Sequence, residues 1–188
     1  MNEGPVYQAT DAATAYAGIG RLPVVVLLDN VRSLYNVGSF FRTGDAVRLQ
    51  RIILSGISAD PGDRRIAKTA LGAERSVLWD RTHDAPVALD TLRERGFQLA
   101  AVETSVTAVD LFDWVPQFPV CLVFGHETDG IAQTVQDRCD LCVRIPTLGL
   151  KQSLNVATAG GVVLYELLRK YRCVCQGSGA ITHCGATE

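Results

Sequence analysis

Residues 24–46 read Val24-Val-Val-Leu-Leu28-Asp-Asn30-Val-Arg-Ser-Leu-Tyr-Asn36-Val-Gly38-Ser-Phe-Phe-Arg42-Thr-Gly-Asp45-Ala. The apolar run at 24–28 does not alternate with polar residues, which predicts a strand buried on both faces. Apolar residues then recur at helical spacing, which predicts a helix from about Asn36, with Arg42 off its buried face. That face is expected to consist of Val37, Phe40, Phe41, Gly44 and Val47.

The alternation of strand and helix continues along the chain. Further apolar runs predict strands at 52–54, 77–79, 97–102, 120–124 and 141–145. Helices are predicted at 64–71, 86–95, 131–137 and 153–171, with Ser153 as the N-cap of the last one. The buried stripe of that helix is expected to be Leu154, Ala157, Gly161, Leu164 and Leu168. We therefore predict an α/β fold: a mostly parallel sheet with helices on both faces.

Length and composition indicate one globular domain, since 188 residues with 47% hydrophobic and 20% charged side chains can build a substantial core. We expect an N-terminal arm at 1–20, a folded domain at 21–172 and a flexible tail at 173–188. No apolar run reaches the ~18 residues of a membrane span, and residues 1–5 do not resemble a secretory signal. These features predict a cytoplasmic protein with no membrane partner.

Charge is unevenly distributed along the chain. The net charge is −2, but residues 32–75 hold eight Lys or Arg against four Asp or Glu and carry +4. A basic patch of this kind can hold a phosphate backbone locally, and a solvated surface is the alternative.

Familiar nucleotide, hydrolase and metal motifs are missing from the sequence. There is no G-x-G-x-x-G after the first strand, no P-loop and no G-x-S-x-G elbow. Cys139 and Cys142 lack the second C-x-x-C pair of a zinc site, so we expect no metal there. The tail residues Cys173, Cys175, His183 and Cys184 leave metal binding and free thiols as alternatives.

Three polar segments, each beside an apolar run, are the candidates for chemistry. They span residues 30–45, 124–130 and 145–155. Segments that begin at Glu103, Gly125 and Pro146 leave the carboxyl ends of predicted strands, where parallel sheets form their ligand crevice. We expect these segments to converge on one composite site.

The three polar segments resemble, in order, the motifs of the SPOUT class of RNA methyltransferases in its TrmH/SpoU branch. Residues 30–46 resemble N-x(5)-N-V-G-x-x-x-R-T-x-D-A, residues 125–130 resemble G-x-E-x-x-G, and residues 145–156 resemble I-P-x-x-G…S-L-N-V. The resemblance covers about residues 22–172. The third motif departs from the pattern at Thr147, where methionine is common, and at Ala157, where serine is common.

This resemblance implies a C-terminal trefoil knot, S-adenosylmethionine as the methyl donor, and a homodimer whose site draws on both subunits. The implied reaction is methyl transfer to a ribose 2′-hydroxyl of tRNA or rRNA. No metal is expected, because the sulfonium methyl group is already activated.

Individual residues carry over from the motifs. Arg42 corresponds to an arginine that contacts the target phosphate and is proposed to help deprotonate the 2′-hydroxyl, and Asn36 to the asparagine that positions it. Because arginine is a poor base, we favour Arg42 as a phosphate clamp. The other implied catalytic residues are Glu127, Ser153 and Asn155.

The expected cofactor positions are Glu103, Thr104, Gly125, Ile145 and Leu154. At Gly125 we expect close approach of the adenine, because a side chain there would fill its space. Asn30 and Arg42 are the expected substrate contacts, although Asn30 is also typical of a turn. Two alternatives remain open: a catalytically silent RNA-binding or assembly factor on the same fold, and methyl transfer to a base.

Overall fold

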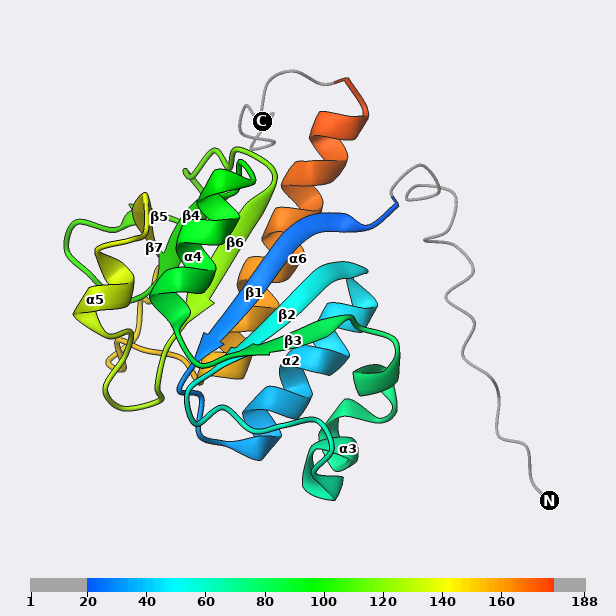
Figure 1. The fold of residues 1–188 in the computed structure, drawn as a ribbon. Coiled ribbons are helices and arrows are strands. Elements are labelled where there is room, and N and C mark those ends of the chain that lie inside the picture. The colour runs from blue at the N-terminus through cyan, green and yellow to red at the C-terminus, as the bar shows by residue number, and fades with distance from the viewer. Residues whose placement is uncertain (1–19, 178–188) are drawn as a thin grey trace.

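The structure is a computed structural model that describes residues 20–177 (Figure 1). Seven strands form one sheet in the order β3-β2-β1-β6-β4-β7-β5, and all neighbouring strands are parallel. This confirms the predicted mostly parallel sheet. The strands are β1 (Leu22–Asp29), β2 (Leu49–Ser55), β3 (Trp79–Thr82), β4 (Gln98–Val102), β5 (Val109–Asp110), β6 (Val120–Phe124) and β7 (Leu141–Arg144).

Helices cover both faces of the sheet, as predicted, because alternate residues of the central strands enter two separate cores. Val26 and Leu28 of β1 pack with α2, α3 and α6, whereas Leu27 packs with α4 and α5. The helices are α2 (Leu34–Ala46), α3 (Arg64–Ala70), α4 (Ala85–Glu94), α5 (Gln133–Gln136) and α6 (Val156–Cys175), and a short 3-10 helix, η1, spans Ala73–Arg75.

Helix α2 buries the face that its sequence predicts. All five expected residues of this face are buried, and Arg42 is exposed. The ring of Phe40 packs against Phe124 of β6, with 5.0 Å between ring centroids. The same ring also lies close to Gly160 of α6, where a Cβ atom would be 2.2 Å from the Phe40 ring. Glycine at 160 therefore lets α6 approach α2 closely.

Helix α6 begins later than the sequence predicts, and the prediction of Ser153 as its N-cap is wrong. The N-cap is Asn155, whose Oδ1 accepts hydrogen bonds from the backbone N–H groups of Ala157 (2.9 Å) and Thr158 (3.3 Å). The helix also continues past Tyr171 to Cys175. Its fully buried stripe is Gly160, Val163, Leu164, Leu167 and Lys170, so only Leu164 of the expected stripe belongs to it.

Lys170 is a buried cation that ties α6 to the segment after β5. Its Nζ donates hydrogen bonds to the carbonyl oxygens of Leu111 (2.6 Å) and Trp114, and it lies 3.5 Å from Glu166 Oε1. Burial lowers the pKa of Lys170, although Glu166 opposes this. The hydrophobic pattern of the sequence does not predict that Lys170 is buried, because lysine is normally assigned to the solvent-facing side of a helix.

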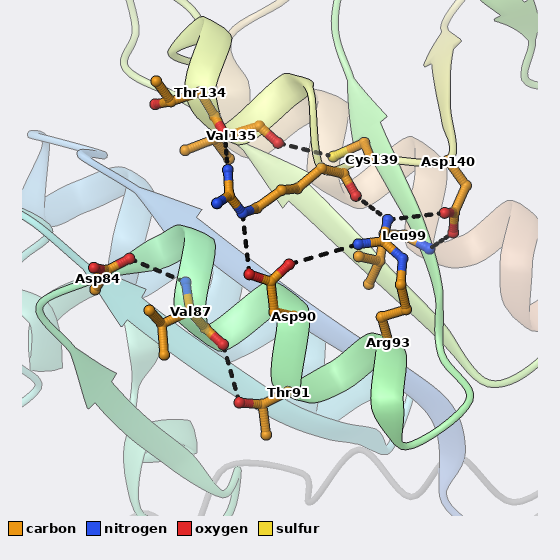
Figure 2. A network of polar contacts seen from close by, with 11 residues as sticks. Asp84, Val87, Asp90, Thr91, Arg93, Leu99, Thr134, Val135, Cys139 and Asp140 are labelled. Atoms are coloured by element: carbon orange, nitrogen blue, oxygen red, sulfur yellow. Dashed lines mark hydrogen bonds and ion pairs between the residues drawn. The ribbon is translucent and has the colours of Figure 1, made fainter.

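A network of ion pairs joins α4 to α5 and to the turn after it (Figure 2). Asp90 of α4 pairs with Arg138 (3.2 Å), and Arg93 pairs with Asp140 (3.0 Å). Asp140 in turn accepts a hydrogen bond from the backbone N–H of Leu99 in β4 (2.7 Å). The network therefore holds the chain that follows the second motif against the sheet.

Other differences from the predictions are small. The strand predicted at 77–79 lies at Trp79–Thr82, and the two-residue strand β5 was not predicted. The predicted arm, apart from residue 20, and most of the predicted tail lie outside the described residues. Within residues 20–177, no helix combines the length and apolarity needed to cross a membrane.

Candidate functional site

A cavity of about 410 Å³ opens at the carboxyl ends of β4, β6 and β7, beside the start of α6. These three strands are neighbours in the sheet, and the chain segments that leave them form most of the wall. This confirms that the segments after the three strands converge. The lining residues are Val102, Glu103, Thr104, Phe124, Gly125, His126, Glu127, Thr128, Gly130, Arg144, Ile145, Thr147, Gln152, Ser153, Leu154, Asn155, Val156 and Ala159.

The cavity gathers most of the residues that the sequence singles out. All five expected cofactor positions line it, and so do three of the expected catalytic residues, Glu127, Ser153 and Asn155. Asn36 is buried behind the wall, in contact with two of them. Arg42 and Asn30 do not line the cavity of their own chain.

Glu127 joins the second motif to the start of α2. Its carboxylate accepts hydrogen bonds from the backbone N–H groups of Arg32 (3.1 Å) and Ser33 (2.9 Å) and from Nδ2 of Asn36 (2.9 Å). A carboxylate is favoured at a helix N-terminus, where free N–H groups and the helix dipole meet. Partial burial raises the pKa of Glu127, but the three hydrogen bonds outweigh it and hold the pKa below its ordinary value. Glu127 is therefore ionised at neutral pH.

Asn36 and Asn155 extend this contact to the third motif. Asn36 uses its Nδ2 for Glu127 and its Oδ1 to accept a hydrogen bond from Nδ2 of Asn155 (3.2 Å). Asn155 then caps α6 with its own Oδ1. Each amide thus donates once and accepts at least once, in a single consistent orientation. One hydrogen-bonded chain, defined here as the Glu127–Asn36–Asn155 chain, connects all three motifs across 119 residues of sequence.

A contact within the protein itself explains the glycine at 125. A Cβ atom at this position would lie 2.3 Å from the carbonyl oxygen of Gly130 and 2.5 Å from the backbone nitrogen of Ile131. The adjoining turn is closed by paired backbone hydrogen bonds between His126 and Gly130, both 3.0 Å. The protein's own backbone therefore already requires glycine here.

Glu103 braces the same turn from β4. Its Oε2 accepts a hydrogen bond from the backbone N–H of Ile131 (3.3 Å), and its Oε1 accepts one from that of Thr104 (2.9 Å). Two carboxylates, Glu103 and Glu127, thus line the cavity. Such a wall favours a ligand that carries positive charge.

Asn30 and Arg42 have other surroundings. Asn30 lies in the left-handed backbone region (φ 59°), and its Oδ1 accepts a hydrogen bond from the backbone N–H of Ile57 (3.2 Å). It thereby fastens the end of β1 to the loop after β2, as its alternative role in a turn predicts. Arg42 projects from α2 into solvent, six residues or about 9 Å beyond Asn36.

Sequence reasoning missed several lining residues. His126 folds its ring over its own turn, where Nδ1 lies 3.2 Å from Asp129 Oδ2. Arg144 and Gln152 line the cavity as well. The only sequence feature that indicates these three residues is their position within or next to the three motifs.

A comparison with protein families places the chain. The model of the SpoU rRNA methylase family matches residues 23–165. The chain belongs to the SpoU methylase family. Its match begins at β1 and ends within α6, so it spans all three polar segments that build the cavity and its support.

Similar proteins agree with this assignment to the SpoU family. A protein of Staphylococcus haemolyticus, named as a TrmH-family tRNA/rRNA methyltransferase, is 32% identical over 149 residues, or 79% of this chain. The chain spans 59% of the length of that relative.

Solved structures of SpoU proteins share the fold. The AdoMet complex of the SpoU methyltransferase AviRb from Streptomyces viridochromogenes has a TM-score of 0.72 at 30% identity, over 78% of this chain and 60% of AviRb. The A. aeolicus TrmH/SpoU tRNA modifying enzyme has a TM-score of 0.74 at 25% identity, over 88% of this chain and 83% of that enzyme.

Proposed function

We propose that this protein is an RNA methyltransferase that transfers a methyl group from S-adenosylmethionine to a ribose 2′-hydroxyl of tRNA or rRNA. The observation that carries the proposal is the Glu127–Asn36–Asn155 chain, which joins the three motifs of the family beside one cavity. The AdoMet complex of the AviRb relative supports the choice of methyl donor.

The cavity suits S-adenosylmethionine in size and chemistry. Its volume of about 410 Å³ lies within the range of small-molecule sites. Ile145 and Leu154 offer apolar surface for the adenine, with Gly125 beside them, and Glu103 and Thr104 offer polar groups. The ionised Glu127 places negative charge where a positive sulfonium is to be held. Bound S-adenosylmethionine supplies a methyl group that its sulfonium has already activated.

The protein's own residues orient the reacting hydroxyl. Glu127 and Asn155 fix the amide of Asn36, so that the start of α2 is rigid beside the cavity. Ser153 adds a hydroxyl to the wall of the same cavity. Arg42 clamps the target phosphate, and Asn30 holds the loop beneath the RNA. Positioning and fixed charge of this kind supply a large part of a rate enhancement.

The active enzyme in this proposal is a cytoplasmic homodimer with a C-terminal trefoil knot. The position of Arg42 supports a shared site, because it is exposed and does not line the cavity of its own chain. Leu148 and Leu150, beside that cavity, are also fully exposed. A second copy that packs there would bring its own Arg42 to the site.

Methyl transfer from tritium-labelled S-adenosylmethionine into RNA tests the proposal. Total RNA from cells that lack the protein is the substrate, and nucleosides are separated by chromatography. We expect a labelled 2′-O-methylnucleoside with the wild type and at least a 100-fold loss with Glu127→Gln. Asp129→Asn is the matched control, since Asp129 is an exposed carboxylate in the same turn that does not line the cavity. Cofactor binding without transfer to any RNA would favour the catalytically silent factor instead, and a labelled base would favour base methylation.

A further inference from the structure

A basic surface covers the outer sides of α2 and α3. We define the α2–α3 basic face as Arg32, Tyr35, Arg42, Arg64, Arg65 and Lys68. All six side chains are exposed, and five of them are cations. The face belongs to the +4 stretch of residues 32–75 in a chain whose net charge is −2.

The two helices that carry this face are held close together. Gly38 of α2 lies under α3, where a Cβ atom would be 2.8 Å from the carbonyl oxygen of Ile66. Figure 1 shows α3 alongside α2 at the end where α2 begins. The pKa of Arg65 on α3 is raised mainly by Asp63, and Tyr35 of α2 makes a small electrostatic contribution. Tyr35 is thus an exposed aromatic residue on the helix that packs against α3, and α3 carries three cations of the face.

Most cations of this face have no anionic partner in the described part of the chain. The side chains of Arg32, Arg42, Arg64 and Lys68 make no ion pair or hydrogen bond within residues 20–177, and only Arg65 is paired, with Asp63 (2.7 Å). Several arginines elsewhere on the surface are paired with carboxylates, as in Arg93 with Asp140 and Arg138 with Asp90. Unpaired cations on a protein of negative net charge keep their full attraction for an external anion.

The face begins at the candidate active site. The backbone N–H of Arg32 donates to Glu127, which lines the cavity, so the segment that leads into α2 belongs both to the cavity's support and to the basic face. Arg64 and Lys68 are four residues apart on α3, which puts them on one side of that helix. A chain of phosphates that passes the cavity mouth would meet these cations next.

We propose that the α2–α3 basic face is the track for the RNA strand that flanks the methylated nucleotide. Phosphates contact Arg32, Arg64 and Lys68, and one unpaired base stacks on Tyr35. The inference rests on the proposed function for the identity of the ligand. Phosphate contacts fix the register of the strand without reading its sequence, and stacking on an aromatic ring tolerates any base. The face would therefore supply affinity and position, and sequence choice would lie elsewhere.

Binding of labelled bulk tRNA, measured by filter retention without cofactor over a range of salt concentrations, tests the track. The slope of log K against log salt is negative, and each lost phosphate contact reduces its magnitude by about 0.7. We expect the magnitude of the slope to decrease by about 0.7 for Lys68→Gln and by about 1.4 for Arg64→Gln/Lys68→Gln. The double variant should also bind on the order of 10-fold more weakly at 0.1 M salt. Tyr35→Ala should weaken binding on the order of 10-fold, and Tyr35→Phe should retain it.

The control is Arg95→Gln, which removes an exposed cation at the end of α4, on the opposite face of the sheet. It should leave the slope and the affinity unchanged. S-adenosylmethionine binding, measured by calorimetry, should be the same in all variants, which shows that they are folded. Equal losses in the control and in the α3 variants, or no loss in the α3 variants, would overturn the proposal. So would a change of oligomeric state in size-exclusion chromatography, which would make the face an interface between copies. If the wild type binds tRNA through this face but transfers no methyl group, the track stands and the proposed function fails.

Discussion

Replacing Asn36 by aspartate tests the Glu127–Asn36–Asn155 chain most severely. Nδ2 of Asn36 donates to Oε1 of Glu127 at 2.9 Å, and Asn36 is 9% exposed. In Asn36→Asp this donor becomes an acceptor oxygen of nearly the same size. Two carboxylates then face each other, while the hydrogen bond from Asn155 to position 36 is retained.

The cost follows from this geometry. Loss of a hydrogen bond to a charged group removes about 1.5–3 kcal/mol. Two charges about 4 Å apart repel by about 4 kcal/mol at an effective dielectric constant of 20, and exposure of Glu127 to solvent reduces this to about 1–2 kcal/mol. We therefore expect Asn36→Asp to lose about 3–4 kcal/mol of folding free energy at pH 8. For a domain of this size the melting temperature should fall by about 10 °C.

The loss should depend on pH, because the paired carboxyls can share a proton. Sharing raises the folded-state pKa of one carboxyl above its unfolded value. The variant is therefore most stable at low pH and loses stability as pH rises through that raised pKa. Thermal unfolding followed by circular dichroism at pH 5 and pH 8 measures this effect. The gap to the wild type should be smaller at pH 5.

A double variant completes the experiment. In Asn36→Asp/Glu127→Gln the amide of position 127 can donate to the carboxylate at 36, so part of the loss should be recovered, with a coupling of 1 kcal/mol or more in the cycle. A melting temperature of Asn36→Asp equal to that of the wild type at pH 8 would show that the Asn36–Glu127 hydrogen bond does not stabilise the fold. Strictly additive single losses would do the same.

Three further predictions concern other contacts. The unfolding free energy of the wild type should fall as pH drops below about 5 through the lowered folded-state pKa of Glu127, and Glu127→Gln should not show this fall. Denaturant unfolding at pH 6 and pH 3.5 measures the difference, and parallel pH profiles of the two proteins would contradict the prediction. Gly125→Ala should destabilise the ligand-free protein by about 2–3 kcal/mol, because the added Cβ atom would lie 2.3 Å from the carbonyl oxygen of Gly130. An unchanged melting temperature without ligand would show that the turn rearranges to accept the Cβ atom. Lys170→Met should lower the unfolding free energy by about 2 kcal/mol and speed amide hydrogen exchange at residues 109–114, because the carbonyl oxygens of Leu111 and Trp114 lose their donor. Unchanged exchange in that segment would show that Lys170 does not anchor it.

The sequence predicts the parts of the fold that depend on local pattern. The apolar run at 120–124 is β6 within one residue at each end, and the helical spacing of Val37, Phe40 and Phe41 predicts the buried face of α2. In both cases the period of burial is a property of the element itself. The resemblance between motifs then predicts which residues gather at the cavity.

Contacts between distant segments account for what the sequence does not predict. Ser153 and Asn155 are both good N-caps, and only the hydrogen bond of Asn155 to Asn36, 119 residues away, distinguishes Asn155 as the residue tied to α2. Because the helix begins two residues later than Leu154, the prediction of Leu154 as the first residue of the buried stripe on α6 is wrong as well. Likewise, nothing local to Glu127 shows that its carboxylate caps α2, or that Gly130 is what requires glycine at 125.

The position of the transferred methyl group in the RNA distinguishes a ribose methyltransferase from the alternatives. RNA labelled by the purified protein with tritiated S-adenosylmethionine is hydrolysed in alkali, which cleaves only next to a free 2′-hydroxyl. We expect the label to elute in dinucleotides, because a 2′-O-methyl group blocks cleavage at its own nucleotide. Label in mononucleotides, or no label in RNA to which the protein binds, would contradict it.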